Sequence, residues 1–122
     1  MAYWIELPTF QDSRGGLTVV DKILPYEIKR VYYIYDVTEK RGGHRHHKAI
    51  QFLVCLAGSC EVYINDGDSE KIYKLDSNTK GLLVEPKDWH TMDAFSKGSV
   101  LLVFSSEHYS KGDYIDEPYH NL

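Results

Sequence analysis

Seven short runs of apolar, β-branched and aromatic residues follow one another so closely that no crossover helix fits between them. Gly, Pro, Asn, Asp or Ser, the residues that favour turns, bound each run. Parallel strands need such crossovers, so we expect these strands to pair antiparallel. The sequence therefore predicts an all-β sandwich or barrel. The predicted strands are 17–20, 30–35, 50–56, 60–64, 71–75, 81–85 and 99–104.

Turn signals separate these strands. Residues 64–68 contain the Asp-Gly pair that is typical of a tight hairpin. Further turns containing Gly or Pro are predicted at 57–59, 86–88 and 96–98. Only 109–113 is compatible with a turn of helix, so the chain should be almost entirely β.

Length and charge limit the class of protein. The 122 residues fit one domain over 1–122, with a barrel over about 1–106 and a polar, tyrosine-rich tail over 107–122. A formal net charge of -4 provides no basic surface for nucleic acid. No run approaches the roughly 18 apolar residues of a membrane span, and the N-terminus lacks the features of a signal peptide. We therefore expect a cytoplasmic protein without nucleic-acid or membrane partners.

Two cysteines flank the turn predicted at 57–59. Cys55 and Cys60 could face each other across a hairpin there. Cytosolic thiols normally stay reduced, and free cysteine is a common core residue. We therefore expect two free thiols.

A cluster of histidines lies between two of the predicted strands, in the stretch Arg-Gly-Gly-His-Arg-His-His-Lys over 41–48. In an extended segment alternate side chains share a face, so His44 and His46 can point into one small volume while His47 points away. Two imidazoles in one pocket can exchange protons near neutral pH or bind a metal ion. Both interpretations remain open at this point.

A second histidine segment follows some forty residues later. Gly81 begins a strand that Pro86 ends, and His90 follows that turn. Together with His44-Arg-His46, this order resembles the cupin pattern, in which an H-x-H strand precedes a G-x(4-5)-P-x-G-x-x-H segment. Metal-binding cupins usually add a glutamate about four residues after the second histidine, and here Ile50 stands there. Three histidines could still hold zinc or iron.

The chain more specifically resembles the bacterial nucleotide-sugar 3,4-ketoisomerases, which are small WxcM-like cupins. Motifs along most of the sequence carry the resemblance: Asp12-Ser-Arg-Gly15, 28–34, Arg41-Gly-x-His44-x-His46, 53–60, Pro86-x-x-Trp-His90 with Met92 and Phe95, and Asp113-Tyr-Ile115. The resemblance implies a jelly-roll cupin that forms a homodimer with an exchanged N-terminal strand.

The same resemblance implies a reaction. The substrate would be dTDP-4-keto-6-deoxyglucose and the product a 3-keto isomer, used to make dTDP-3-amino-3,6-dideoxysugars for surface polysaccharide. No metal or other cofactor is expected. His44 and His46 are the expected catalytic acid and base, because each can accept and donate a proton.

The remaining site residues are expected to bind substrate. Arginines suit the diphosphate, phenols or Arg41 could stabilise an oxyanion, and an aromatic ring such as Trp89 could stack on thymine. The expected binding residues are Arg14, Arg30, Tyr32, Tyr33, Arg41, Gln51, Trp89 and His90.

Two alternatives stay open. The first is a metal-dependent cupin, such as a small dioxygenase or isomerase, that uses His44, His46 and His90 as ligands. The second is a cupin that binds a nucleotide sugar without catalysis. The configuration of the product at C4 is also open: Arg14 favours the galacto isomer, whereas Asp93 stands where the resemblance predicts histidine or arginine.

Overall fold

The computed structural model describes residues 1–120, and the regular secondary structure in this range is almost entirely β-strand. The only helical piece is a short 3-10 helix, η1, at Lys111–Asp113. The strands are β1 (Tyr3–Glu6), β2 (Thr9–Asp12), β3 (Gly15–Thr18), β4 (Arg30–Tyr35), β5 (Arg41–His46), β6 (Gln51–Ala57), β7 (Cys60–Asn65), β8 (Glu70–Leu75), β9 (Lys80–Val84), β10 (Trp89–Asp93), β11 (Val100–Ser105) and β12 (Tyr114–Ile115).

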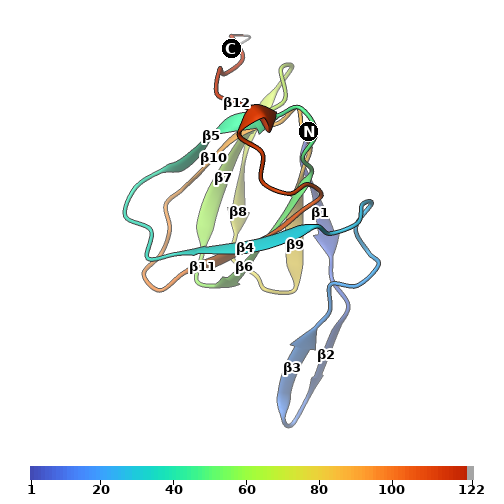
Figure 1. Cartoon of the computed structure of the whole chain (residues 1–122). Coiled ribbons are helices and arrows are strands. Elements are labelled where there is room, and N and C mark those ends of the chain that lie inside the picture. Colours follow the sequence, from blue (N-terminus) through green and yellow to red (C-terminus); the bar gives the residue numbers. More distant parts are fainter. Residues whose placement is uncertain (121–122) are drawn as a thin grey trace.

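Two five-stranded sheets form the body of the molecule (Figure 1). One sheet has the order β1-β9-β6-β11-β4, and the other has the order β12-β5-β10-β7-β8. The strand pairs of both sheets are antiparallel, as are β2 and β3, which form a separate hairpin. The prediction of an antiparallel all-β domain is confirmed.

Most connections cross from one sheet to the other. The Asp-Gly turn joins β7 and β8 within one sheet, so the hairpin predicted at 64–68 is confirmed. The turn at 57–59 instead joins β6 to β7 of the opposite sheet, and the turns at 86–88 and 96–98 also change sheets. The two cysteines are therefore not partners across a hairpin, and both are free and buried, as expected.

The apolar core lies between the two sheets. It contains side chains from both, including Leu53, Val62, Ile64, Leu82 and Leu101, each at most 1% exposed. A second apolar cluster covers the outer face of the β6 sheet, where partly buried residues of the segment before β4 pack on buried side chains of β6 and β9. Strand β6 is consequently buried on both faces, which explains its nearly continuous apolar sequence.

Several predicted boundaries need correction. The first run, at 17–20, starts too late, because β3 covers Gly15–Thr18 and Val20 packs in the outer cluster. Strands β1, β2, β5, β10 and β12 were not among the seven predicted runs, although an extended conformation was expected for the histidine stretch in β5. In β10 the sequence Trp-His-Thr-Met-Asp mixes polar and apolar residues, so it lacks a strand-like apolar run. The predicted helical turn exists, but only as η1.

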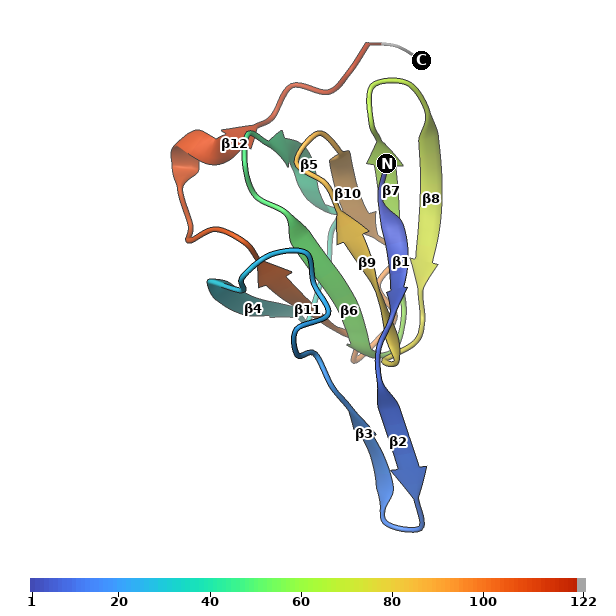
Figure 2. The ribbon, with the colours of Figure 1, turned by 90° about the vertical axis from the view of Figure 1, so that its right-hand side faces the viewer.

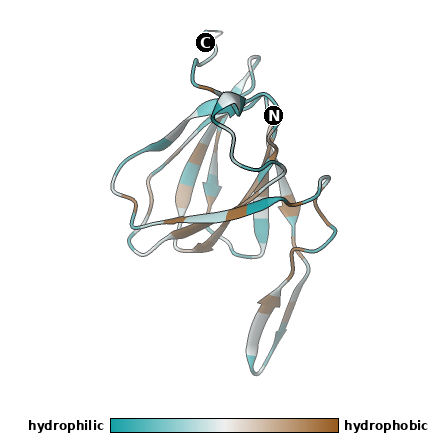
Figure 3. Cartoon of the chain, viewed as in Figure 1, coloured by the Kyte–Doolittle hydropathy of each residue, from teal (hydrophilic) through white to brown (hydrophobic). Residues whose placement is uncertain are grey.

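The N-terminal region leaves the body of the molecule. Strand β1 pairs with β9 of its own sheet, and the β2–β3 hairpin then projects beyond it (Figure 2). The hairpin carries hydrophobic residues among hydrophilic ones (Figure 3), and Phe10 and Leu17 are 64% and 58% exposed. Over residues 1–120 the structure contains no helix with the length and apolar character that a membrane crossing requires.

Candidate active site

A cavity of about 480 Å³ opens between the two sheets, a size typical of small-molecule sites. Strands β4, β5 and β10 supply most of its wall, and β12 contributes one residue. The lining residues are Arg30, Tyr32, Tyr33, Ile34, Tyr35, Arg41, Gly42, His44, His90, Met92 and Tyr114. The cavity thus combines two arginines, several phenols and two histidines, including six of the ten residues proposed from the sequence.

A β-bulge in β5 determines which side chains face this cavity. His44 pairs directly with His90, but the register then shifts, so Gly42 pairs with Thr91 and Arg41 with Met92. The extra residue puts Arg41 on the same face as His44, which simple alternation along the strand would not do. Gly42 has a φ of +86°, and a Cβ there would lie 2.9 Å from the carbonyl oxygen of His90, so glycine is required.

Three histidine rings meet beside the cavity. The ring centroid of His44 lies 5.1 Å from that of His46 and 5.0 Å from that of His90. The ring of Tyr114 packs against both His44 and His46, with centroids 4.7 Å apart in each case. The predicted pair of histidines on one strand face is therefore present, with a third histidine and a phenol in contact with it.

Asp113 fixes the orientation of His46. Nδ1 of His46 lies 3.0 Å from Oδ2 of Asp113. The same carboxylate accepts hydrogen bonds from the backbone N–H groups of Lys48 and Ala49, at 2.8 and 3.2 Å. Because the carboxylate only accepts, Nδ1 of His46 carries the proton in this pair. Nε2 of His46 is buried and has no hydrogen-bond partner among the described residues, and His46 does not itself line the cavity.

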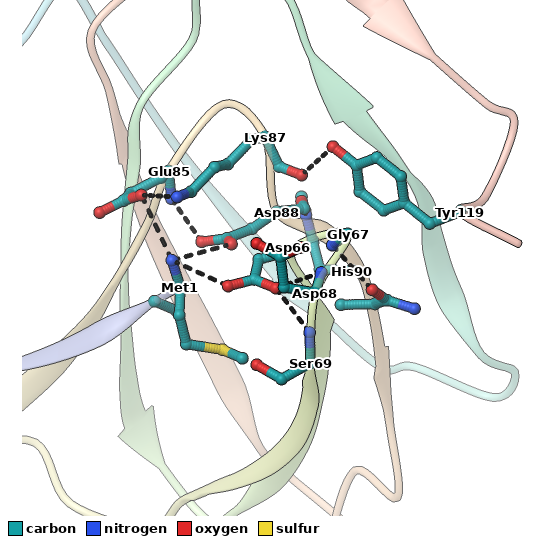
Figure 4. Close-up of polar contacts among 12 residues, drawn as sticks. Met1, Asp66, Gly67, Asp68, Ser69, Glu85, Lys87, Asp88, His90 and Tyr119 are labelled. Atoms are coloured by element: carbon teal, nitrogen blue, oxygen red, sulfur yellow. Dashed lines mark hydrogen bonds and ion pairs between the residues drawn. The ribbon is translucent and has the colours of Figure 1, made fainter. Parts of the chain in front are cut away.

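His90 is held in a similar way. Its Nδ1–H donates to the backbone carbonyl of Asp88 at 2.9 Å, which leaves Nε2 as the free nitrogen. The carboxylate of Asp88 accepts a bond from the backbone N–H of Glu85 and so fixes the turn that precedes β10 (Figure 4). Since His90 is 1% exposed and Asp88 is fully buried, this corner of the site is rigidly packed.

Burial keeps the three imidazoles neutral. Desolvation, reinforced by the neighbouring His90, lowers the pKa of His44 to about 4. Desolvation also lowers the pKa of His90 to about 4, against the opposing effect of its bond to Asp88. The pKa of His46 is lowered by burial and by His44, although Asp113 favours its charged form. Near neutral pH these rings therefore carry lone pairs that can accept protons.

We expect the buried His90 to make the protein less stable in acid. Its pKa returns to about 6.5 on unfolding, so between about pH 6.5 and 4 the unfolded chain binds more protons than the folded protein. Stability is thus retained above that range and lost as the pH falls through it. Between about pH 7 and 5, His90 should account for about 2 kcal/mol of lost stability.

Chemical denaturation of wild type and His90→Asn at both pH values measures this contribution. The wild type should lose more stability than the variant on acidification, because asparagine does not titrate. Equal losses in the two proteins would show that His90 is protonated equally in the folded and unfolded states.

Arg30 and the phenols on β4 form the opposite wall. The guanidinium of Arg30 stacks on the ring of Tyr32, 4.4 Å from its centroid. The hydroxyl of Tyr32 accepts a bond from Nε2 of Gln51 at 3.2 Å, and burial raises the pKa of this phenol. Gln51 thus contacts a lining residue but is not itself part of the lining. Tyr33 lines the cavity although it is 64% exposed.

The structure places two other expected site residues away from this cavity. Trp89, together with Asp93, lies on the opposite face of β10 and lines a separate cavity of about 400 Å³. Arg14 lies at the exposed turn between β2 and β3 and forms an ion pair of 2.6 Å with Asp12. Neither Trp89 nor Arg14 lines the cavity that His44 and His90 line.

Three residues that meet at the site had no role predicted from the sequence. Asp113 and Tyr114 belong to the segment interpreted as a polar tail, although the motif Asp113-Tyr-Ile115 was part of the family resemblance. Met92, two residues after His90, shares its face of β10 and lines the cavity. A carboxylate and a phenol far along the chain give no local signal that they contact a histidine.

The three histidines also have the geometry of a metal site. One nitrogen from each of His44, His46 and His90 lies within 4.8 Å of the others. The bonds that His46 and His90 make through Nδ1 are those that metal-binding histidines commonly make to carboxylates and carbonyls. The donor set therefore fits a transition metal, with nitrogen ligands alone and no carboxylate from position 50.

The sequence matches, over residues 2–121, the family described as FdtA: WxcM-like, C-terminal. A TDP-4-oxo-6-deoxy-alpha-D-glucose-3,4-oxoisomerase from Aneurinibacillus thermoaerophilus is 47% identical over 108 residues, which cover 85% of this chain and 78% of that protein.

Solved structures are similar as well. A His-to-Asn mutant of the 3,4-ketoisomerase QdtA from Thermoanaerobacterium thermosaccharolyticum, in complex with TDP-4-keto-6-deoxyglucose, superposes with a TM-score of 0.91 and 38% identity over 95% of this chain and 87% of that one. The TDP-fucose-3,4-ketoisomerase WlaRA from Campylobacter jejuni superposes with a TM-score of 0.89 and is 33% identical in sequence. The match covers 95% of this chain and 89% of that one.

Proposed function

This chain belongs to the FdtA family of WxcM-like proteins and is a sugar-nucleotide 3,4-ketoisomerase, and we propose that it converts TDP-4-keto-6-deoxyglucose to a 3-keto isomer by proton transfer through His44 and His46. The cupin fold that the sequence predicted agrees with this family. The product would supply the biosynthesis of dTDP-3-amino-3,6-dideoxysugars for surface polysaccharide.

One observation supports the histidine mechanism above all others. His44 lines a cavity of small-molecule size, His46 is buried behind it with the two ring centroids 5.1 Å apart, and burial lowers the pKa of both imidazoles. A neutral imidazole can remove a proton from carbon, and the resulting imidazolium can return one. The site therefore carries the groups that an isomerisation by proton transfer requires.

The proposed reaction moves two protons and uses no external oxidant or reductant. A base removes the proton from C3, next to the C4 ketone, and the electrons of that C–H bond form an enediolate between C3 and C4. The hydroxyl proton passes from the oxygen on C3 to the oxygen on C4. Delivery of a proton to C4 then leaves the ketone at C3, so atoms and electrons balance.

The surroundings of the two histidines differ, and this suggests separate roles. Asp113 accepts from Nδ1 of His46 and favours its protonated form, so we assign the base to Nε2 of His46. Among residues 1–120 no carboxylate makes a hydrogen bond to His44, and its pKa of about 4 makes its protonated form a strong acid, although Asp116 acts in the opposite direction. We assign His44 to proton transfer between the two oxygens, directly or through a water molecule.

The cationic and phenolic wall supports substrate binding. Arg41 faces the same cavity as His44 because of the β5 bulge, and Arg30 lies across from it on β4. We propose that these arginines bind the diphosphate and that the hydroxyl of Tyr32 or Tyr33 donates to the oxyanion of the enediolate. Gln51 supports Tyr32 through its hydrogen bond.

Arg14 supports a proposal about the product and the assembly. We propose the galacto configuration at C4, on the presence of Arg14 alone. Arg14 lies at the turn between β2 and β3 of the projecting hairpin, so it would reach a cavity only in another copy of the chain. We therefore also propose a homodimer in which the N-terminal region crosses to the partner, with the exposed Phe10 and Leu17 covered there.

A metal-dependent isomerase is the second candidate, because three histidine nitrogens converge within 4.8 Å. His44, His46 and His90 would hold the ion, which would supply Lewis-acid polarisation of a substrate oxygen. We favour the metal-free mechanism, since the usual carboxylate ligand is replaced by Ile50 and enediol chemistry needs only proton transfer.

Incubation with TDP-4-keto-6-deoxyglucose in deuterated water, with and without prior chelation, tests the reaction and both candidates. We expect a 3-keto product in each case, with solvent deuterium at C4 to the extent that the base exchanges its proton before returning it. NMR of the product also reports the configuration at C4.

Other outcomes would change the assignment. Activity that chelation abolishes and one added metal ion per chain restores would establish the metal-dependent candidate. The absence of product and of exchange at C3, together with tight binding of TDP, would indicate a cupin that binds nucleotide sugars without catalysis.

A further inference from the structure

The end of the chain crosses the part of the sheet that carries the histidines. Strand β12 pairs with β5, so that Tyr114 lies opposite His46 and Ile115 opposite Arg45. The chain then continues from β12 past the ends of β5 and β10 toward the β7–β8 hairpin (Figure 2). We refer to residues 113–119 as the closing segment.

Two contacts fasten the closing segment to the start of β10. The indole Nε1–H of Trp89 donates to the backbone carbonyl of Asp116 at 3.0 Å. The hydroxyl of Tyr119 donates to the carbonyl of Lys87 at 2.8 Å (Figure 4). The Lys87 carbonyl and the Trp89 indole belong to the same short stretch as Asp88, whose carbonyl accepts from His90. The closing segment is therefore attached to the stretch that positions His90.

The ring of Tyr119 also makes close contacts with two other strands or turns. The guanidinium of Arg45 stacks on it, 4.4 Å from the ring centroid. A Cβ at Gly67 would lie only 3.3 Å from a carbon of the same ring, so the glycine leaves the space that the ring uses. Tyr119 therefore bridges β5, the β9–β10 turn and the β7–β8 hairpin.

Strand β12 depends on such contacts for its position. It has only two residues, and so short a strand contributes few ladder hydrogen bonds of its own. Asp113, just before it, is held by His46 and two backbone N–H groups, whereas Tyr114 follows and packs by ring contacts on His44 and His46. The anchors that come after Tyr114 keep its ring against the histidines.

We propose that the closing segment contributes to catalysis. Trp89 and Tyr119 act as positioning residues that hold Tyr114 over His44 and His46. This inference rests on the proposed isomerase function. Tyr114 covers one side of the two imidazoles and limits the access of water to them. Loosening the segment should therefore slow turnover and let the base exchange its proton with solvent more often.

The test uses Trp89→Phe, Tyr119→Phe and the double variant in the full chain. Each change removes one hydrogen-bond donor and keeps an aromatic ring. Trp4→Phe is the matched control, because Trp4 packs on Tyr73 in another part of the fold. Hydrogen exchange at the amides of Tyr114 and Ile115 measures local opening of the closing segment in the absence of substrate. The exchange rate should increase about tenfold in the double variant.

Turnover supplies the second measurement. We expect kcat to fall about tenfold in the double variant, with the Kd for TDP unchanged and more deuterium at C4 of the product in deuterated water. Unchanged amide exchange, or faster exchange with unchanged kcat and unchanged deuterium content, would overturn the proposal. If the wild type is inactive, the isomerase function fails, and the exchange measurement still decides whether these residues anchor the segment.

Discussion

Alanine at His44 or His46 should lower kcat by about 10²- to 10⁴-fold, the range typical of a lost general acid or base. Alanine removes the imidazole at each position, while Arg30 and Arg41, the proposed diphosphate ligands that line the cavity, remain. The affinity for TDP should therefore stay close to that of the wild type. Initial rates and calorimetric titration with TDP measure the two effects separately.

His47→Ala is the matched control for this experiment. His47 follows His46 directly but is exposed, and it does not line the histidine cavity. Its substitution should leave kcat within about twofold of the wild type. Similar mild effects at all three positions would mean that His44 and His46 do not carry the proton transfer.

Asp113→Asn should reduce kcat by roughly 10²-fold or more, because the substitution changes which tautomer of His46 is present. The carboxylate accepts from Nδ1–H of His46 and so leaves the lone pair on Nε2, toward the cluster. An asparagine amide can turn its N–H₂ toward Nδ1, and Nε2 then carries the proton and cannot act as a base. Turnover measured across the pH range, together with NMR of the imidazole nitrogens, would detect both changes.

Glu117→Gln provides the control for the lost charge. Glu117 lies in the same closing segment, but its side chain is 74% exposed and pairs with His120 rather than with the cluster. The substitution should leave kcat and the tautomer of His46 unchanged. If Asp113→Asn proved as active as Glu117→Gln, the carboxylate would be only a structural support for the loop after β5.

The sequence alone was sufficient for the class of fold and for the central pair of histidines. Close spacing of apolar runs excludes crossover helices, and this local property predicted antiparallel sheets. Alternation along a strand likewise placed His44 and His46 on one face. Both inferences depend only on residues that are near one another in the chain, which is why they could be made without the structure.

Tertiary structure decided the remainder of the site. The β5 bulge turns Arg41 toward the cavity, and it depends on pairing with β10, which the sequence did not predict as a separate strand. Asp113 and His46 are 67 residues apart, so their contact arises only when β12 joins the edge of the sheet. Trp89 faces away from the cavity and binds the closing segment, because the side chains of β10 alternate between two faces. Contacts between distant segments follow from strand order and register, and the local patterns of a single sequence do not specify either.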